Sequence, residues 1–328
     1  ESFIEAILRT VPGVAGGTLV VGGDGRYGNR RAIGVIARMA AAHGVARILT
    51  TTGGILSTPA ASNLIRQHQA TAGIILSASH NPGGPDGDFG VKVNGANGGP
   101  APESLTDAIY ACSQQLAGYR IWGDVSLALD QPGQQTIGAL QVQVIDGVDD
   151  YIALMQKLFD FDQISDLLRG DYPIAFDAMH AVTGPYAHAI LEERLGAAKG
   201  TVVNGVPSPD FGGGHPDPNP IWAKALMDTM HGPGAPDFGA ASDGDGDRNG
   251  CRHGRDRHAG VVDQGTDQSQ HQNRQETGPQ RRDPDERPRQ QPAGPTDEEG
   301  KEDQDQRNHQ GEDAGGQQRD VRLQLALH

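Results

Sequence analysis

The sequence predicts an α/β fold with two successive α/β domains, whose sheets are mixed but mainly parallel, and then a disordered or non-native polar tail. Short apolar runs alternate with helical patterns up to about residue 250. The apolar run at 74–76 is followed by a polar loop rich in glycine, and loops that follow buried strands often carry the functional residues of α/β proteins. Such alternation is typical of parallel strands covered by helices on both faces.

The first predicted domain covers residues 1–148. Three apolar runs predict its buried strands: TLVVGG at 18–23, RILTT at 47–51 and TAGIILS at 71–77. Two segments predict helices, one by apolar spacing and one by a proline in its first turn: NRRAIGVIARMAAAHG at 29–44 and PAASNLIRQHQ at 59–69. Glycine and glutamine are common between about 117 and 146, which we interpret as a linker or an irregular edge.

The second predicted domain covers residues 149–250 and repeats the alternation. Its helices are predicted from three segments: DDYIALMQKLF at 149–159, GPYAHAILEERLG at 184–196 and PIWAKALMDTM at 220–230. Its strands are predicted from three more: YPIAFDA at 172–178, GTVVNG at 200–205 and the start of PDFGAASDGDGDRN at 236–249. The last strand leads into an acidic loop.

The alternation of predicted strands and helices ends after about Asn249, and residues 251–328 form the predicted tail. The segment 263–320 contains no tyrosine, phenylalanine, tryptophan, isoleucine, leucine or methionine. It cannot bury enough apolar area to offset an ordering cost of roughly 1–2 kcal/mol per residue. The tail is either a disordered interaction segment or a frame-shifted product. We favour the second because the change is abrupt, and we expect at most a short helix at 321–328.

Composition narrows the class of protein. The net charge of −15 argues against binding to nucleic acid or to an anionic membrane. The two cysteines, Cys112 and Cys251, lie far apart and predict a reducing compartment without a disulfide framework. No apolar run approaches about 18 residues, the length of a membrane span. We therefore expect a soluble, cytoplasmic monomer.

A glycine-rich loop follows the first strand, where GGDGRYG places glycines at 23, 25 and 28. This spacing is the dinucleotide-binding pattern, which also needs an acidic residue about 20 positions later for the ribose. No aspartate or glutamate occurs from residue 25 to 85, so the dinucleotide interpretation fails. Arg26 and the backbone donors of this loop could still face a phosphate, and Arg26 could equally be a surface charge.

The loop after the third strand carries Ser79 and His80 among four glycines, which allow a close approach to an anion. No G-x-S-x-G surrounds Ser79, so a hydrolase fits poorly. A phosphorylated serine fits better, since its charge of about −1.5 to −2 would need a cation and backbone donors. The alternative is an ordinary surface turn.

The acidic loop can bind such a cation, because DGDGDR places Asp243, Asp245 and Asp247 at alternate positions. Hard oxygen ligands at this density suit Mg²⁺. An EF-hand loop is excluded because its sixth position must be glycine and is Arg248 here. Arg248 suits a metal that also meets a phosphate. The alternative is a solvated acidic turn.

Lys92, in DFGVKVN, lies on the strand predicted to leave the serine loop. A lysine on a strand is usually a surface residue whose charged end reaches water. Close to a phosphoserine and a metal, it could instead relay a proton to or from a sugar hydroxyl.

Together, SASHNPGGPDGDFGVKVNGANGGPAPE and SDGDGDRN resemble the α-D-phosphohexomutase superfamily. The stretches GGDGRYGN, GGILSTPAAS and FGGGHPDPNP are similar to its α-phosphoglucomutase branch. The resemblance covers residues 1 to about 249. It implies an enzyme with four α/β domains around one cleft, which interconverts glucose 1-phosphate and glucose 6-phosphate.

The resemblance also implies the site residues. Ser79 would be the phosphorylated serine, and Asp243, Asp245 and Asp247 would hold one Mg²⁺ together with a phosphoserine oxygen. Arg248 and Arg26 would steady the phosphoryl group, while Lys92 and His80 are candidates for proton handling or orientation. Ser79 would give its phosphoryl group to the sugar monophosphate, forming glucose 1,6-bisphosphate, which turns over and returns its other phosphate.

The departure from the family lies after Asn249, where we find neither its sugar-binding loop nor its distal phosphate-binding loop. We therefore expect little or no turnover from this chain alone. Two alternatives stay open. One is a non-catalytic two-domain protein that binds metal and phosphate and uses the tail for partners. The other is a phosphohexomutase for mannose or N-acetylglucosamine phosphates.

Overall fold

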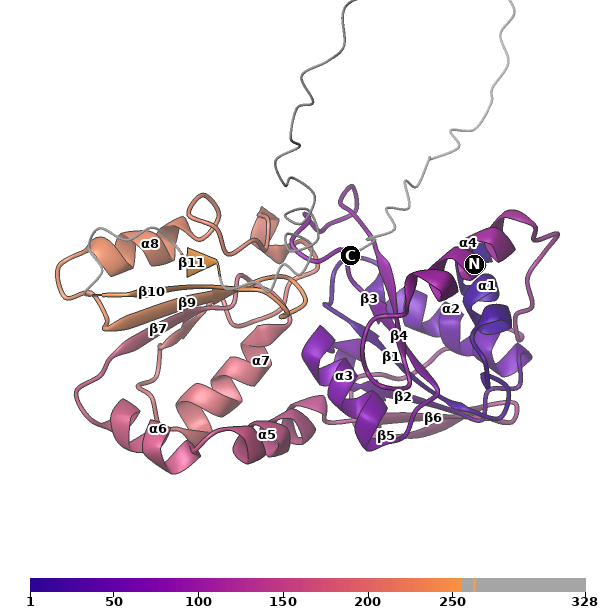
Figure 1. The fold of residues 1–328 in the computed structure, drawn as a ribbon, viewed down its shortest axis with the longest axis horizontal. Coiled ribbons are helices and arrows are strands. Elements are labelled where there is room, and N and C mark those ends of the chain that lie inside the picture. The colour runs from indigo at the N-terminus through magenta and orange to yellow at the C-terminus, as the bar shows by residue number, and fades with distance from the viewer. Residues whose placement is uncertain (255–261, 264–328) are drawn as a thin grey trace, which may run out of the picture. The chain divides into compact units, whose positions relative to one another are not determined.

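The computed structural model describes residues 1–254 and the short strand Val262–Asp263. Figure 1 shows two sheets that follow one another along the chain. The first sheet has the order β4-β3-β1-β2-β6-β5. Its strands are β1 (Thr18–Gly23), β2 (Arg47–Thr51), β3 (Ala72–Leu76), β4 (Val91–Gly95), β5 (Gly133–Ile137) and β6 (Leu140–Ile145). The four central strands are parallel, and β4 and β5 are antiparallel edges.

Helices cover both faces of this sheet because successive side chains of a strand point to opposite faces. Leu19 and Val21 of β1 belong to the core cluster that contains residues of α1 and α2, whereas Val20 packs with residues of α3. The helical elements are α1 (Ser2–Thr10), α2 (Asn29–Ala42), the 3₁₀ turn η1 (Thr52–Gly54), α3 (Thr58–Gln67) and α4 (Glu103–Gln114).

The second sheet has the order β11-β10-β9-β7-β8. Its strands are β7 (Ile174–Asp177), β8 (Val202–Val203), β9 (Phe238–Ser242), β10 (Asn249–His253) and β11 (Val262–Asp263). Strands β8 and β9 run parallel to β7, while β10 is antiparallel to β9. The helical elements are α5 (Gly147–Leu158), α6 (Phe161–Arg169), α7 (Thr183–Ala187), the π-helix η2 (His188–Arg194), the 3₁₀ turn η3 (Phe211–Gly213) and α8 (Lys224–His231).

The predicted α/β fold with mixed, mainly parallel sheets is confirmed. The interpretation of residues 117–146 as a linker or irregular edge is wrong in its second part, where β5 and β6 form a regular hairpin. Leu140, Val142 and Val144 are buried and alternate with glutamines, so the period is that of a strand. The abundance of glutamine and glycine concealed this alternation.

Three other boundaries differ from the prediction. The helix predicted at 220–230 begins only at Lys224, and the helix predicted at 184–196 changes from α7 to the π-helix η2 at His188. The apolar pattern stops at residue 249, yet β10 continues to His253, because a strand is held by backbone hydrogen bonds to β9 and needs few apolar side chains.

The predicted division into residues 1–148, 149–250 and 251–328 stays a prediction, and its first boundary falls inside α5. The predicted tail beyond β11, including the short helix at 321–328, lies outside the described residues. Among the residues that the structure describes, no helix has the length and apolarity needed to cross a membrane.

Candidate active site

Two loops at one edge of the first sheet carry Arg26 and Ser79. Strand β1 ends at Gly23 and the neighbouring parallel strand β3 ends at Leu76, so both carboxyl ends lie at the same edge. The backbone N–H of Asp24 donates to the carbonyl of Leu76 (3.1 Å), which joins the two loops where they leave the sheet. The topology therefore brings Arg26 to Ser79 although 53 positions separate them.

Ser79 is buried and has a φ of 51°, in the left-handed region that non-glycine residues rarely adopt. Its N–H donates to Ser77 Oγ (2.8 Å), and its carbonyl accepts from Arg26 (3.0 Å). A backbone conformation of this kind costs about 1–3 kcal/mol and persists only where neighbours hold it. These two hydrogen bonds hold the backbone of Ser79 in this conformation.

Arg26 is fully buried, and its guanidinium contacts a carboxylate, two backbone carbonyls and an aromatic ring. It forms an ion pair with Asp24 (2.9 Å) and donates to the carbonyls of Asp88 (2.7 Å) and Ser79 (3.0 Å). Its central carbon lies 5.2 Å from the ring centre of Phe211, which belongs to the second sheet's loops. Arg26 thus positions the serine loop, and the predicted contact with a phosphoryl group stays a prediction.

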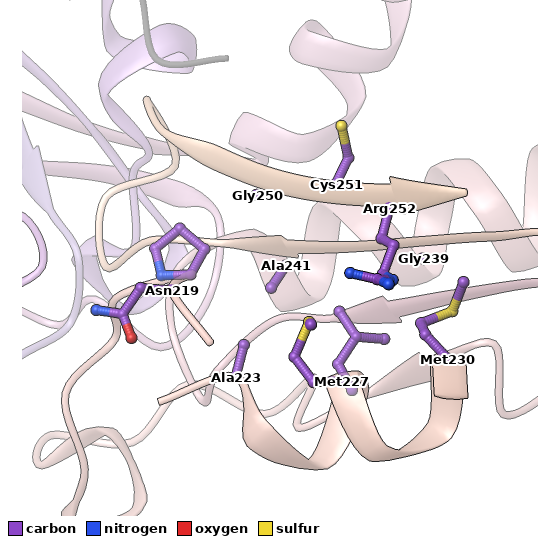
Figure 2. A pocket seen from close by; sticks show the side chains of 11 residues that line it. Asn219, Ala223, Met227, Met230, Gly239, Ala241, Gly250, Cys251 and Arg252 are labelled. Carbon is purple, nitrogen blue, oxygen red and sulfur yellow. The ribbon is translucent and has the colours of Figure 1, made fainter. Parts of the chain in front are cut away.

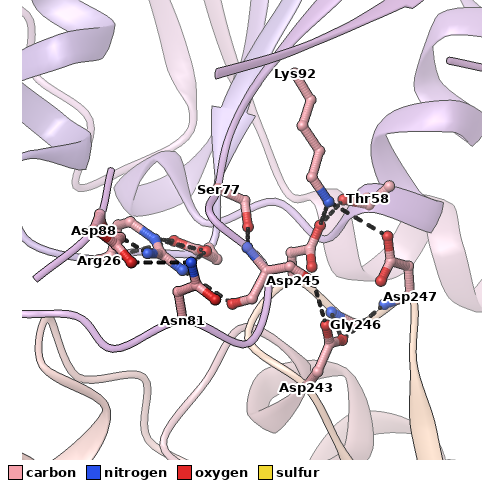
Figure 3. A network of polar contacts seen from close by, with 12 residues as sticks. Arg26, Thr58, Ser77, Asn81, Asp88, Lys92, Asp243, Asp245, Gly246 and Asp247 are labelled. Carbon is pink, nitrogen blue, oxygen red and sulfur yellow. Dashed lines mark hydrogen bonds and ion pairs between the residues drawn. The ribbon is translucent and has the colours of Figure 1, made fainter. Parts of the chain in front are cut away.

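The acidic loop connects β9 to β10 and carries Asp243 (Figure 3). Asp243 Oδ1 accepts three backbone N–H groups at 3.0–3.1 Å, from Gly246, Asp247 and Arg248. Asp243 Oδ2 accepts the hydroxyl of Ser79 at 2.8 Å. The predicted proximity of the serine and the acidic loop is therefore present, and a hydrogen bond joins them.

Asp245 and Asp247 share one cation, Lys92, which extends from the second position of β4 (Figure 3). Lys92 Nζ lies 2.8 Å from Asp245 Oδ2 and 3.5 Å from Asp247 Oδ2. Asp245 Oδ2 also accepts the hydroxyl of Thr58. Asp245 Oδ1 is buried and has no hydrogen-bond partner in the described part of the chain.

The carboxylates of Asp243, Asp245 and Asp247 each offer an oxygen within 4.8 Å of the others. Burial, and then the charges of Asp245 and Asp247, raise the pKa of Asp243 well above its ordinary value. Burial acts on Asp245 in the same direction, but Lys92 holds the pKa of Asp245 below its ordinary value. Burial and Asp245 raise the pKa of Asp247. A divalent cation among these oxygens would relieve their repulsion.

His80 contacts Arg248 rather than Ser79. The Arg248 guanidinium donates to His80 Nδ1, so the histidine is neutral and its proton is on Nε2. Burial, and then the charge of Arg248, lower the pKa of His80, in agreement with this state. His80 therefore orients Arg248, which is the residue predicted to meet the phosphate.

Sequence reasoning missed Asp24, Ser77, Thr58 and Phe211. Asp24 stands inside the glycine-rich loop GGDGRYG, directly before the Gly-Arg pair, and an acidic residue so close to an arginine was a readable signal. Thr58 stands directly before the helix predicted at 59–69 and is the first residue of α3, but nothing in the local sequence connects it to Asp245. Partners of this kind become visible only when the loops are folded together.

A separate small pocket lies between α8 and strands β9 and β10 (Figure 2). Its lining is mainly apolar and includes Leu226, Met227 and Met230, with glycines at 239 and 250. It contains none of the predicted site residues. Arg252 is the one charged residue among the described residues that line this pocket, whereas the carboxylate cluster brings three carboxylates together with Ser79 and Lys92, and it is therefore the candidate site.

Comparisons with known proteins agree with the observed fold. Residues 1–120 match the family description "Phosphoglucomutase/phosphomannomutase, alpha/beta/alpha domain I", and residues 149–255 match that of domain II. A phosphoglucomutase of Rhizobium radiobacter is 57% identical over 249 residues, which are 76% of this chain and 46% of that protein. A phosphoglucomutase of Aspergillus oryzae is 51% identical over 252 residues, or 76% of this chain and 45% of that one.

Among solved structures, the exocytosis-sensitive phosphoprotein pp63/parafusin of Paramecium, a phosphoglucomutase, is similar with a TM-score of 0.73 and 41% identity. The match covers 77% of this chain and 49% of that one. The chain thus spans about half the length of the curated relatives it matches. Since both domain descriptions match in the same order as the two observed sheets, the chain belongs to the phosphoglucomutase/phosphomannomutase family.

Proposed function

We propose that this chain carries the phosphoryl-transfer site of a phosphoglucomutase. Ser79 would accept and return a phosphoryl group as glucose 1-phosphate and glucose 6-phosphate interconvert through glucose 1,6-bisphosphate. The hydrogen bond of 2.8 Å between Ser79 Oγ and Asp243 Oδ2 is the observation that carries the proposal, because it places the serine at the carboxylate cluster. The names of the relatives support the choice of sugar phosphate.

The residues present fit Mg²⁺ as the cation. Three carboxylates converge, they are hard oxygen donors, and the buried Asp245 Oδ1 has no partner among the described residues. Asp243, Asp245 and Asp247 would hold the ion, together with a phosphate oxygen on Ser79. When bound, Mg²⁺ would neutralise charge that develops on the phosphoryl oxygens.

The chain's own residues would prepare the serine for transfer. The bond from Arg26 helps to hold the backbone of Ser79, and the bond to Asp243 orients its hydroxyl, so that little orientational freedom has to be lost during reaction. Asp243 Oδ2 accepts a hydrogen bond from the Ser79 hydroxyl. This contact makes the Asp243 carboxylate the candidate acceptor for the hydroxyl proton when the phosphoryl group arrives.

Lys92 would act as a positive charge or a proton donor, and not as a base. Burial lowers the pKa of Lys92, but Asp245 and Asp247 more than reverse that effect, so its pKa is raised. A lysine with a raised pKa stays protonated at neutral pH. Arg248, held by neutral His80, would add a second charge for the phosphate.

The test is whether Ser79 takes up a phosphoryl group. The chain is incubated with glucose 1,6-bisphosphate and Mg²⁺, and the peptide containing Ser79 is examined for a mass increase of about 80 Da, the mass of one phosphoryl group. We expect the increase in the wild type and its absence in Ser79→Ala. Absence of phosphate from the wild-type peptide, or phosphate that persists in Ser79→Ala, would contradict the proposal.

Turnover and sugar preference are measured on the same protein. Glucose 1-phosphate, mannose 1-phosphate and N-acetylglucosamine 1-phosphate are compared with the bisphosphate activator present. The proposal expects glucose 1-phosphate to be preferred wherever turnover is detectable. Metal and bisphosphate binding without any transfer to Ser79 would instead favour a non-catalytic binding protein.

A further inference from the structure

The two carboxylate oxygens of Asp245 have different surroundings. Oδ2 accepts hydrogen bonds from the Thr58 hydroxyl and from Lys92 Nζ. Oδ1 is equally buried but has no hydrogen-bond partner in the part of the chain that the structure describes. A buried charged oxygen without a hydrogen-bond partner is unfavourable, so it indicates a ligand that the described residues do not supply.

Thr58 holds Asp245 by two separate groups. Its backbone N–H, at the start of α3, donates to the carbonyl of Asp245 at 2.9 Å. Its hydroxyl donates to the carboxylate of the same residue. The backbone bond fixes where the acidic loop passes, and the hydroxyl fixes how the Asp245 side chain is turned.

We propose that Thr58 is a positioning residue for a divalent cation, because its hydroxyl occupies Oδ2 of Asp245 and thereby turns Oδ1 toward the ion. The proposal rests on the cation site of the proposed function and adds a residue to it. Lys92 occupies the same Oδ2, so both donors leave Oδ1 as the oxygen available for coordination. Residues that hold a metal ligand in place typically change metal affinity by about 10–100-fold when they are lost.

The substitution Thr58→Val isolates the hydroxyl. Valine has nearly the same shape and keeps the backbone N–H, so the bond to the Asp245 carbonyl and the start of α3 are retained. Thr58→Ser restores the hydroxyl without the methyl group. Thr50→Val is the matched control, because Thr50 is a buried threonine on β2 whose hydroxyl has no partner among the described residues.

Binding of Mn²⁺ to the full chain is measured by the loss of the free-ion signal in electron paramagnetic resonance. We expect Thr58→Val to weaken Mn²⁺ binding about tenfold, and Thr58→Ser and Thr50→Val to stay within about twofold of the wild type. Unfolding by urea is followed in parallel, so that affinity is compared between folded proteins. A purely structural role for Thr58 would lower stability without changing the affinity of the folded protein.

Two results would overturn the inference, and they differ in what they say of the function. If the wild type binds Mn²⁺ and Thr58→Val binds it equally well, the role of Thr58 is wrong while the cation site stands. If the wild type fails to bind Mn²⁺ at millimolar concentration, or if Asp245→Asn binds as tightly as the wild type, the cation site of the proposed function fails with it.

Discussion

The substitution Arg26→Met tests whether the buried guanidinium holds the serine loop. It leaves the carboxyl of Asp24 buried without its cation, which typically costs about 3–5 kcal/mol. The carbonyls of Ser79 and Asp88 also lose a donor, at about 1 kcal/mol each. We therefore expect the free energy of unfolding to fall by about 5–7 kcal/mol in urea titrations at pH 7.

Comparison variants separate this effect from the loss of any arginine. Arg30→Met removes an exposed ion pair with Asp130 and should leave the urea midpoint unchanged. Arg26→Lys keeps the charge but not the planar fork, so it should lose about half as much as Arg26→Met. Adding Asp24→Asn to Arg26→Met removes the carboxyl that would otherwise be buried without a cation. The double variant should therefore lose about 2 kcal/mol less stability than the sum of the two single variants. A loss below about 1 kcal/mol for Arg26→Met, or strict additivity, would refute the reasoning.

Three further predictions concern stability. Lys92→Met leaves the carboxylate of Asp245 without its cation and should lower the free energy of unfolding by about 2 kcal/mol in metal-free urea titrations at pH 7. This loss is smaller than for a fully buried ion pair because the lysine is partly exposed, and an unchanged midpoint would contradict it. Burial acts to raise the pKa of Glu5, but its hydrogen bonds outweigh burial and hold the pKa below its ordinary 4.5. Its contribution to stability is therefore present above pH 4.5 and is lost as the pH falls through the lowered pKa. Glu5→Gln should cost about 1–3 kcal/mol at pH 7, and the gap from wild type should close as the pH falls below 4.5 in pH-dependent unfolding. Gly184→Ala places a Cβ 1.9 Å from the carbonyl oxygen of Gly205 and should cost about 3 kcal/mol by thermal unfolding, whereas Gly34→Ala, with open space around it, should be neutral or stabilising.

Much of this fold can be predicted from the sequence, because the spacing of apolar residues along the chain indicates which segments are strands and which are helices. The runs at 18–23, 47–51 and 71–77 correspond to β1, β2 and β3, which are buried throughout except at the first residues of β1 and β2. Such continuous runs are typical of a parallel sheet covered on both faces. The hairpin of β5 and β6 was missed because its exposed positions are glutamines, and composition obscured an alternation visible at Leu140, Val142 and Val144.

The residues of the candidate site likewise fall into those that the sequence predicts and those that it does not. Ser79 and the acidic loop could be found because each is a local pattern whose residue types and spacing already indicate phosphate and metal chemistry. Thr58 and Phe211 could not, since each acts on a residue far away in sequence: Thr58 on Asp245, and Phe211 on Arg26. A local pattern can show which atoms do chemistry, but the residues that hold those atoms depend on how distant loops meet.

Phosphorylation of Ser79 and cation binding should be coupled, because they change the same contact. In the unphosphorylated chain the Ser79 hydroxyl donates to Asp243 Oδ2. A phosphoryl group removes that donor and brings a charge of about −1.5 to −2 toward a carboxylate. Lys92 is already shared by Asp245 and Asp247, so it would balance this added charge only in part, and Arg248 would balance a further part. A divalent cation held by the three carboxylates would balance the rest, which is why the phosphorylated form should bind the metal more tightly than the free serine.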